Sequence, residues 1–188
     1  MSDTMTPEEI GAHAEARFSR IMNEMWHNRP SWFLGVLPAP PFFDHKKIDF
    51  FAYIQNKNED GVIIMLIQIK SSVQRARTFE KTLRSIEICP VVVNESHNDD
   101  GIRNFVIPTL DSARRDESDR YARNRMLLLE LEKVPLRGRA LVAFENTKQL
   151  RGQFPHLTEE LLKKLSQGYR IEWYDPERQA VHLVRRNP

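Results

Sequence analysis

The first hydrophobic pattern along the chain has the spacing of an amphipathic helix over residues 6–26. The start of this helix is indicated by Thr6, Pro7 and Glu9, because Thr6 can cap it, Pro7 suits its first turn and Glu9 completes a capping box. Apolar side chains then share one face: Ile10, Gly11, Ala14, Phe18, Ile21, Met22 and Met25. Glu15 falls inside this face, so we expect its carboxylate to border the core.

The second pattern alternates with a period of two and predicts a β-hairpin made of residues 48–55 and 62–70. The intervening KNEDG supplies turn residues. The preceding LPAPPFF, residues 37–43, is a proline-rich connection that excludes regular helix and central strand. One face of the hairpin is apolar throughout: Ile48, Phe50, Ala52, Ile54, Ile63, Met65, Ile67 and Ile69.

Three polar side chains share the other face of the hairpin at one end: Asp49, Gln68 and Lys70. A two-residue loop would set Asp49 directly opposite Gln68, and a four-residue loop would set it opposite Lys70. A three-residue loop or a bulge would separate these groups. With either even-numbered loop, a carboxylate, an amide and an ammonium group gather at the end of an apolar hairpin.

The remainder of the chain predicts a strand at 88–93, a helix at 110–132, a strand at 140–144, a helix at 158–168 and a terminal hairpin of 170–174 and 180–184. These elements indicate an α/β fold with a mixed central sheet flanked by helices. We expect a single domain over residues 1–188, with the core motifs in 6–93 and additional helices and the terminal hairpin in 94–188.

Composition narrows the class of protein only moderately. The net charge of +2 is mildly basic, so binding to nucleic acid would require the positive residues to gather on one face. The longest apolar run, Val62 to Ile67, is too short to span a bilayer, and the N-terminus lacks a signal pattern. Cys89 has no cysteine partner for a disulfide or a zinc site. These features predict a soluble cytoplasmic protein with no membrane association.

The polar end of the hairpin has the chemistry of a site for a hard cation. Mg²⁺ prefers oxygen ligands and retains several waters. Asp49 can offer a carboxylate oxygen, Gln68 an amide oxygen and Ile69 its backbone carbonyl. Lys70 could orient or deprotonate a water, or stabilise charge on a phosphate, and partial burial would lower its pKa.

Together with Glu15 on the first helix, Asp49 in KKIDFF and the pair Gln68 and Lys70 in IQIKSS resemble the PD-(D/E)XK nuclease superfamily. The pair Gln68-x-Lys70 resembles the Mrr-like or Holliday-junction-resolvase-like variant of this superfamily, which has Gln-x-Lys. The resemblance implies a restriction-endonuclease-like α-β-β-β-α-β core. The expected order is the helix at 6–26, the hairpin, a third strand at 88–93, a helix and the strand at 140–144.

The same resemblance implies hydrolysis of phosphodiester bonds with Mg²⁺ or Mn²⁺ as the cofactor. Asp49 and Gln68 would bind the metal together with the Ile69 carbonyl, and Lys70 would act on the attacking water. Glu15 would be a direct or water-mediated ligand. The chain departs from the family pattern in carrying Gln68 at an acidic position and Ile48 where many members have proline.

Residues after the hairpin are candidates for contact with a nucleic acid. Ser71 and Ser72 could donate to a phosphate, or could simply end the strand. The basic residues that follow could line a groove for the phosphate backbone, or could form a solvated face: Arg75, Arg77, Lys81 and Arg84.

The sequence therefore predicts a metal-dependent endonuclease that cuts DNA in preference to RNA. A second hypothesis is a catalytically inactive module of the same fold that binds nucleic acid or a protein partner. A third is a protein–protein adaptor unrelated to nucleic acid. The alternative for the residues themselves is that Asp49 and Lys70 form a structural ion pair, with Gln68 hydrogen-bonded nearby. Cleavage specificity, endonuclease or exonuclease action, a homodimeric state and the biological role all stay open.

Overall fold

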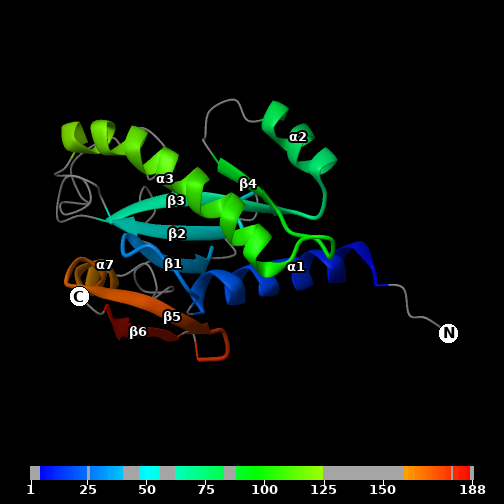
Figure 1. Ribbon diagram of the computed structural model, residues 1–188. Helices are drawn as coiled ribbons and strands as arrows, with labels where there is room; N and C mark the ends of the chain where they lie inside the picture. Colours follow the sequence, from blue (N-terminus) through cyan, green and yellow to red (C-terminus); the bar gives the residue numbers. More distant parts are fainter. Residues whose placement is uncertain are drawn as a thin grey trace.

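The computed structural model describes residues 5–24, 26–39, 47–55, 62–82, 88–124, 159–178 and 180–186. Within them lies a four-stranded sheet made of β1 (Phe33–Pro38), β2 (Phe50–Gln55), β3 (Val62–Lys70) and β4 (Ile88–Val92). The strands lie in the order β1-β2-β3-β4. The first three run antiparallel and β4 runs parallel to β3, so the sheet is mixed and the fold is α/β (Figure 1).

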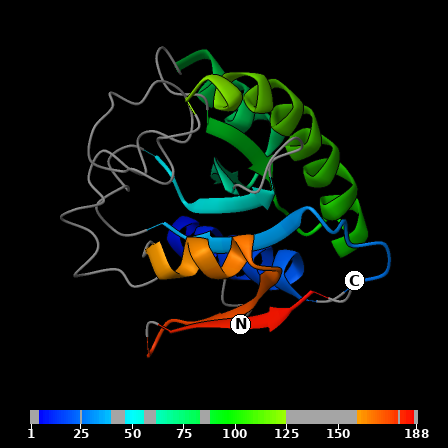
Figure 2. The ribbon, with the colours of Figure 1, turned by 90° about the vertical axis from the view of Figure 1, so that its left-hand side faces the viewer.

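Four described helices and a second, two-stranded sheet accompany the central sheet. The helices are α1 (Pro7–Asn23), α2 (Val73–Thr82), α3 (Asp99–Asn124) and α7 (Glu159–Ser166). The strands β5 (Tyr169–Asp175) and β6 (Ala180–Arg185) form an antiparallel hairpin. This hairpin lies beyond β1, and α3 crosses one face of the central sheet (Figures 1 and 2). No helix in the described part of the chain is long and apolar enough to cross a membrane.

The predicted capping box of α1 is confirmed. The Glu9 backbone N–H donates to the Thr6 hydroxyl at 3.2 Å, and the Thr6 N–H donates to the Glu9 carboxylate at 2.6 Å. Burial begins only at Ala14, and Ile10 is 43% exposed. The expectation that Glu15 borders the core is wrong: the residue is exposed, although its neighbour Ala14 is buried, so Glu15 lies outside the face of α1 that packs on the core.

The predicted hairpin of β2 and β3 is confirmed. Phe50 pairs with Ile67, which sets the preceding Asp49 opposite Gln68, as a two-residue loop would require. The loop itself, residues 56–61, lies outside the described residues. Both faces of β2 and β3 are buried, and the exceptions are the last residues of the two strands, Gln55 and Lys70, which are partly exposed.

Two elements were not predicted, and another has a different place in the sheet. Strand β1 includes Leu37 and Pro38 of the proline-rich segment, and Pro38 is tolerated at the end of an edge strand, where the missing N–H breaks no ladder. Helix α2 follows β3 directly. Strand β4 confirms the strand expected at 88–93, but it is the fourth strand and comes after α2, so the expected third place is wrong.

The later elements agree with expectation where they are described. The helix expected at 110–132 begins earlier, at Asp99, because Asp99 and Asp100 supply an acidic first turn. Helix α7 and the terminal hairpin are confirmed. The strand expected at 140–144 lies outside the described residues.

An amide side chain fixes the end of α1 to the edge strand β1. The Asn23 side chain donates to the Val36 carbonyl and accepts from the Val36 N–H, both at 2.8 Å, so it pairs as a further strand would. Gly35 permits this approach, because a Cβ there would lie 2.9 Å from the Asn23 oxygen and 2.7 Å from Ile171 on β5. Gly35 also has φ +125, which other residues rarely adopt. Three elements therefore meet at this glycine.

Replacement of Gly35 tests this junction. We expect Gly35→Ala to lower the free energy of unfolding by about 1–3 kcal/mol, because the added methyl group forces Asn23 or Ile171 to move. The measurement is urea unfolding followed by circular dichroism. Gly11→Ala is the matched control, because a Cβ there meets no atom within 4 Å, and it should stabilise α1 by about 0.5–1 kcal/mol. Equal effects of the two changes would contradict the junction.

Candidate functional site

Backbone pairing on both sides holds Asp49 at the start of β2. Its N–H donates to the Ile67 carbonyl at 2.9 Å, and its carbonyl accepts from the Ala39 N–H at 2.8 Å. The carboxylate oxygen Oδ2 accepts from the Ile69 N–H at 2.6 Å and from the Gln68 amide nitrogen at 2.5 Å. The carboxylate therefore binds across the end of β3, where the sequence predicted that these polar groups would gather.

The Gln68 side chain is a buried polar group with one atom left unpaired. It is 6% exposed. Its Nε2 contacts Asp49 Oδ2 and also lies 3.4 Å from the Ile69 carbonyl oxygen, whereas its Oε1 is buried without a hydrogen-bond partner. The amide nitrogen thus lies between two of the oxygens that were expected to bind a metal. A half-turn of the amide would bring the unpaired oxygen to that position.

Lys70 lies at the end of β3 under the following helix. Its ammonium group is 4.6 Å from the centre of the Phe79 ring on α2, a cation–π contact. Its pKa is lowered from the ordinary value, chiefly because partial burial disfavours the charged form. Phe79 was not identified from the sequence, since only the helical spacing of α2 brings it back over Lys70.

The charges around Lys70 act on its pKa in opposite directions. The carboxylates of Asp49 and Glu15 raise this pKa, while Lys47 and Arg75 lower it. Lys47 immediately precedes the site and has a left-handed backbone with φ 58, which is uncommon for a residue other than glycine. Lys47 was not among the predicted site residues, although it belongs to the basic pair in KKIDFF.

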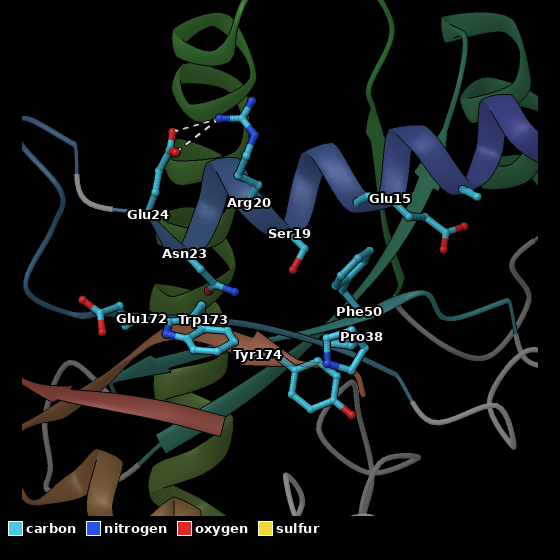
Figure 3. A pocket seen from close by; sticks show the side chains of 13 residues that line it. Glu15, Ser19, Arg20, Asn23, Glu24, Pro38, Phe50, Glu172, Trp173 and Tyr174 are labelled. Atoms are coloured by element: carbon cyan, nitrogen blue, oxygen red, sulfur yellow. Dashed lines mark hydrogen bonds and ion pairs between the residues drawn. The ribbon is translucent and has the colours of Figure 1, made fainter. Parts of the chain in front are cut away.

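Glu15 reaches the same region from α1. Glu15 lines the same groove as Phe50 and Pro38 (Figure 3). It is also close enough to Lys70 to influence the pKa of that lysine. Among the described residues no three His, Cys, Asp or Glu side chains form a group that could hold a metal ion. A metal between Asp49 and Glu15 would therefore depend on amide and carbonyl oxygens as well.

The residues expected to contact nucleic acid lie at the start of α2. Ser72 caps this helix by accepting from the Arg75 N–H at 3.3 Å, and the Arg75 guanidinium donates to the Ser71 hydroxyl at 3.2 Å. Arg75 and Arg77 are exposed. Lys81 lies in the last turn of α2, and Arg84 lies outside the described residues.

Comparison of the chain with protein-family models, with curated proteins and with solved structures gives no match.

The close contact of Asp49 and Gln68 predicts the effect of a second carboxylate. We expect Gln68→Glu, in metal-free buffer near neutral pH, to lower the free energy of unfolding by about 1–3 kcal/mol, because a hydrogen-bond donor is replaced by a like charge. Repulsion raises the pKa of one carboxyl group in the folded state. The loss is therefore greatest above that pKa and shrinks as the pH falls toward about 4, where both carboxyl groups of the unfolded chain become protonated.

The measurement is urea unfolding at several pH values. Gln74→Glu, on the exposed surface of α2, is the control and should change stability little at any pH. A loss for Gln68→Glu that does not vary with pH would contradict the contact.

Proposed function

We propose that the protein is a nuclease of the PD-(D/E)XK type that hydrolyses phosphodiester bonds with Mg²⁺ or Mn²⁺. The observation that carries the proposal is the convergence of Asp49, Gln68 and Lys70 at one end of the sheet, with Asp49 bound to the end of β3 through 2.5 and 2.6 Å hydrogen bonds. DNA is the proposed substrate, because the resemblance is to enzymes that cut DNA.

The order of the elements supports the proposal. From α1 to β4 the chain runs helix, three antiparallel strands, helix and a strand parallel to the third. This order of element types matches the α-β-β-β-α-β order that the resemblance implies. The three antiparallel strands are β1, β2 and β3, whereas the sequence had predicted the strand at 88–93 as the third strand. The candidate residues then fall on corresponding elements: Glu15 on the first helix, Asp49 before the second strand and Lys70 at the end of the third.

The donor set fits a hard divalent cation. Asp49 would hold it through the carboxylate, Ile69 through its carbonyl and Gln68 through Oε1, the buried oxygen that has no hydrogen-bond partner. Glu15 is exposed and reaches the site from α1, which suits a ligand that acts through a water. When bound, such a cation polarises a phosphoryl oxygen and makes water a better nucleophile at neutral pH.

Lys70 is suited to hold the attacking water or to take its proton. Partial burial lowers its pKa, so a larger share of this amine is neutral at a given pH than for an exposed lysine. The Phe79 ring restrains the ammonium group when the amine is protonated. Asp49 and Glu15 then balance its charge, as would be needed beside an anionic phosphate.

The start of α2 provides the proposed contacts to the phosphate backbone. Ser71 and Ser72 immediately follow Lys70, and Arg75 and Arg77 are exposed on the next turn and a half. Arginine side chains placed along one helix would neutralise phosphates without reading the sequence. This arrangement supports binding along a strand near the candidate site.

Lys70→Ala tests the proposed activity. We expect the unchanged protein to cut DNA in the presence of Mg²⁺ or Mn²⁺, and the variant to cut about 10²–10⁴-fold more slowly, because a proton-transfer group is lost. The measurement is the initial cleavage rate on labelled single-stranded, duplex and branched DNA. Lys163→Ala, an exposed lysine of α7, is the matched control and should keep the full rate.

The outcomes separate the competing hypotheses. Equal rates for Lys70→Ala and the unchanged protein would contradict the proposed site. Absence of cleavage by all three proteins, with DNA binding intact, would favour the inactive module, for which the neutral Gln68 is the supporting feature. Thermal unfolding with Mn²⁺ gives a readout besides activity: the metal should stabilise the unchanged protein and should fail to stabilise Asp49→Ala.

A further inference from the structure

A groove with a volume of about 510 Å³ runs between α1 and β5 (Figure 3). This volume lies in the range of small-ligand pockets. Its lining includes two side chains of α1, two residues of the central sheet and two aromatic side chains of the terminal hairpin: Glu15, Ser19, Pro38, Phe50, Trp173 and Tyr174. Glu15 is also a proposed metal ligand, whereas Asp49, Gln68 and Lys70 do not line the groove, so a phosphate bound at the proposed site would lie near the Glu15 end of the groove.

The hairpin contributes a flat aromatic surface to the groove. Trp173 is 45% exposed, although it is a large apolar residue. One face of its indole stacks on the His182 imidazole across the hairpin, with ring centres 3.6 Å apart and planes at 6°. His182 does not line the groove, so a different part of the indole faces it. The stack fixes the ring in advance, which reduces the entropy that a ligand would lose on binding.

The amide and the arginine at the groove are already engaged with the protein. Asn23 pairs with Val36, and Arg20 binds Glu24 and Asp99. The exposed Glu172 adds a carboxylate to the lining, and the Ser19 hydroxyl, which has no hydrogen-bond partner among the described residues, points into the groove (Figure 3). The groove therefore favours a flat ligand that binds mainly through its faces and whose edge can donate hydrogen bonds to a carboxylate.

We propose that this groove binds the base of an unpaired nucleotide next to the cleaved phosphodiester, stacked on Trp173. The identity of the ligand rests on the proposed nuclease function, and the inference names the substrate class: single-stranded DNA, or DNA with an unpaired segment. A paired base is held in the stack of its duplex and cannot enter such a groove unless it is extruded. Stacking on an aromatic side chain tolerates any base, because every base has a flat face.

The test is binding in a buffer that contains EDTA, so that cleavage is not required. The probes are a fluorescein-labelled single-stranded oligodeoxynucleotide and the same strand in a blunt duplex, measured by fluorescence anisotropy. We expect Trp173→Ala to weaken single-strand binding about 5- to 150-fold, as the loss of one stacked base predicts, with less than about a 2-fold effect on the duplex. Phe105→Ala, 53% exposed on α3, is the matched control and should change neither affinity.

A second variant guards against a folding defect in the hairpin. Ser19→Phe fills the groove from α1 without altering β5 or β6, and it should also weaken single-strand binding selectively. A direct readout is intrinsic fluorescence: single-stranded DNA should quench the unchanged protein, and this quenching should be lost in Trp173→Phe, which keeps an aromatic ring.

The inference is overturned if the unchanged protein does not bind single-stranded DNA, if both variants bind it normally, or if they lose single-strand and duplex binding equally. These outcomes are separate from failure of the nuclease proposal. Metal-dependent cleavage that is unaffected by Trp173→Ala would support the nuclease proposal and contradict the base-binding groove. Selective single-strand binding that depends on Trp173, without cleavage in any metal, would support the groove and contradict the nuclease proposal.

Discussion

Burial of β3 on both faces is the constraint on which the rest of the molecule depends. Eight consecutive residues of this strand are buried, and Lys70, the ninth, is only partly exposed. Burying a polar group inside such a strand costs free energy unless the group forms a hydrogen bond. The only tolerant place is the carboxyl end, where Asp49 reaches across from β2 to Gln68 and Ile69. The fold therefore concentrates Asp49, Gln68 and Lys70 at one end of the sheet.

The contact of Asp49 with Gln68 links stability to the proposed chemistry. A neutral amide satisfies the carboxylate in the absence of a cation, because its Nε2 lies between Asp49 and the Ile69 carbonyl. The acidic residue found at this position in the PD-(D/E)XK pattern would place two negative charges there and would need a cation to balance them. Under the proposed function, Gln68 would therefore lower the affinity for the metal in return for a site that is already ordered without it. The unpaired Oε1 is the cost of that arrangement.

Sequence reasoning succeeded where local periodicity decides the structure. A period of two was enough to set Asp49 opposite Gln68, because any even loop keeps the polar residues on one face. Prediction failed where contacts between distant segments determine the structure. Strand β1 contains Gly35 and ends in Pro38. Gly35 has φ +125, and Asn23 and Ile171, which come from distant segments, lie close to it. The exposure of Glu15 beside the buried Ala14 likewise depends on which side of α1 packs against the sheet, and the apolar stripe does not define the edges of that side.

Helix α1 connects the parts of the proposed site, since it presents different faces to each of them. Its apolar face packs in the core, Glu15 and Ser19 face the groove, and Arg17 binds the backbone of the segment between β4 and α3 as well as Asp99. Anchors at the far end and on the opposite side of the helix therefore help to set the position of Glu15 relative to Asp49. If both proposals hold, this helix would carry one carboxylate into the proposed metal site and the proposed base-binding groove, and the two would then move together.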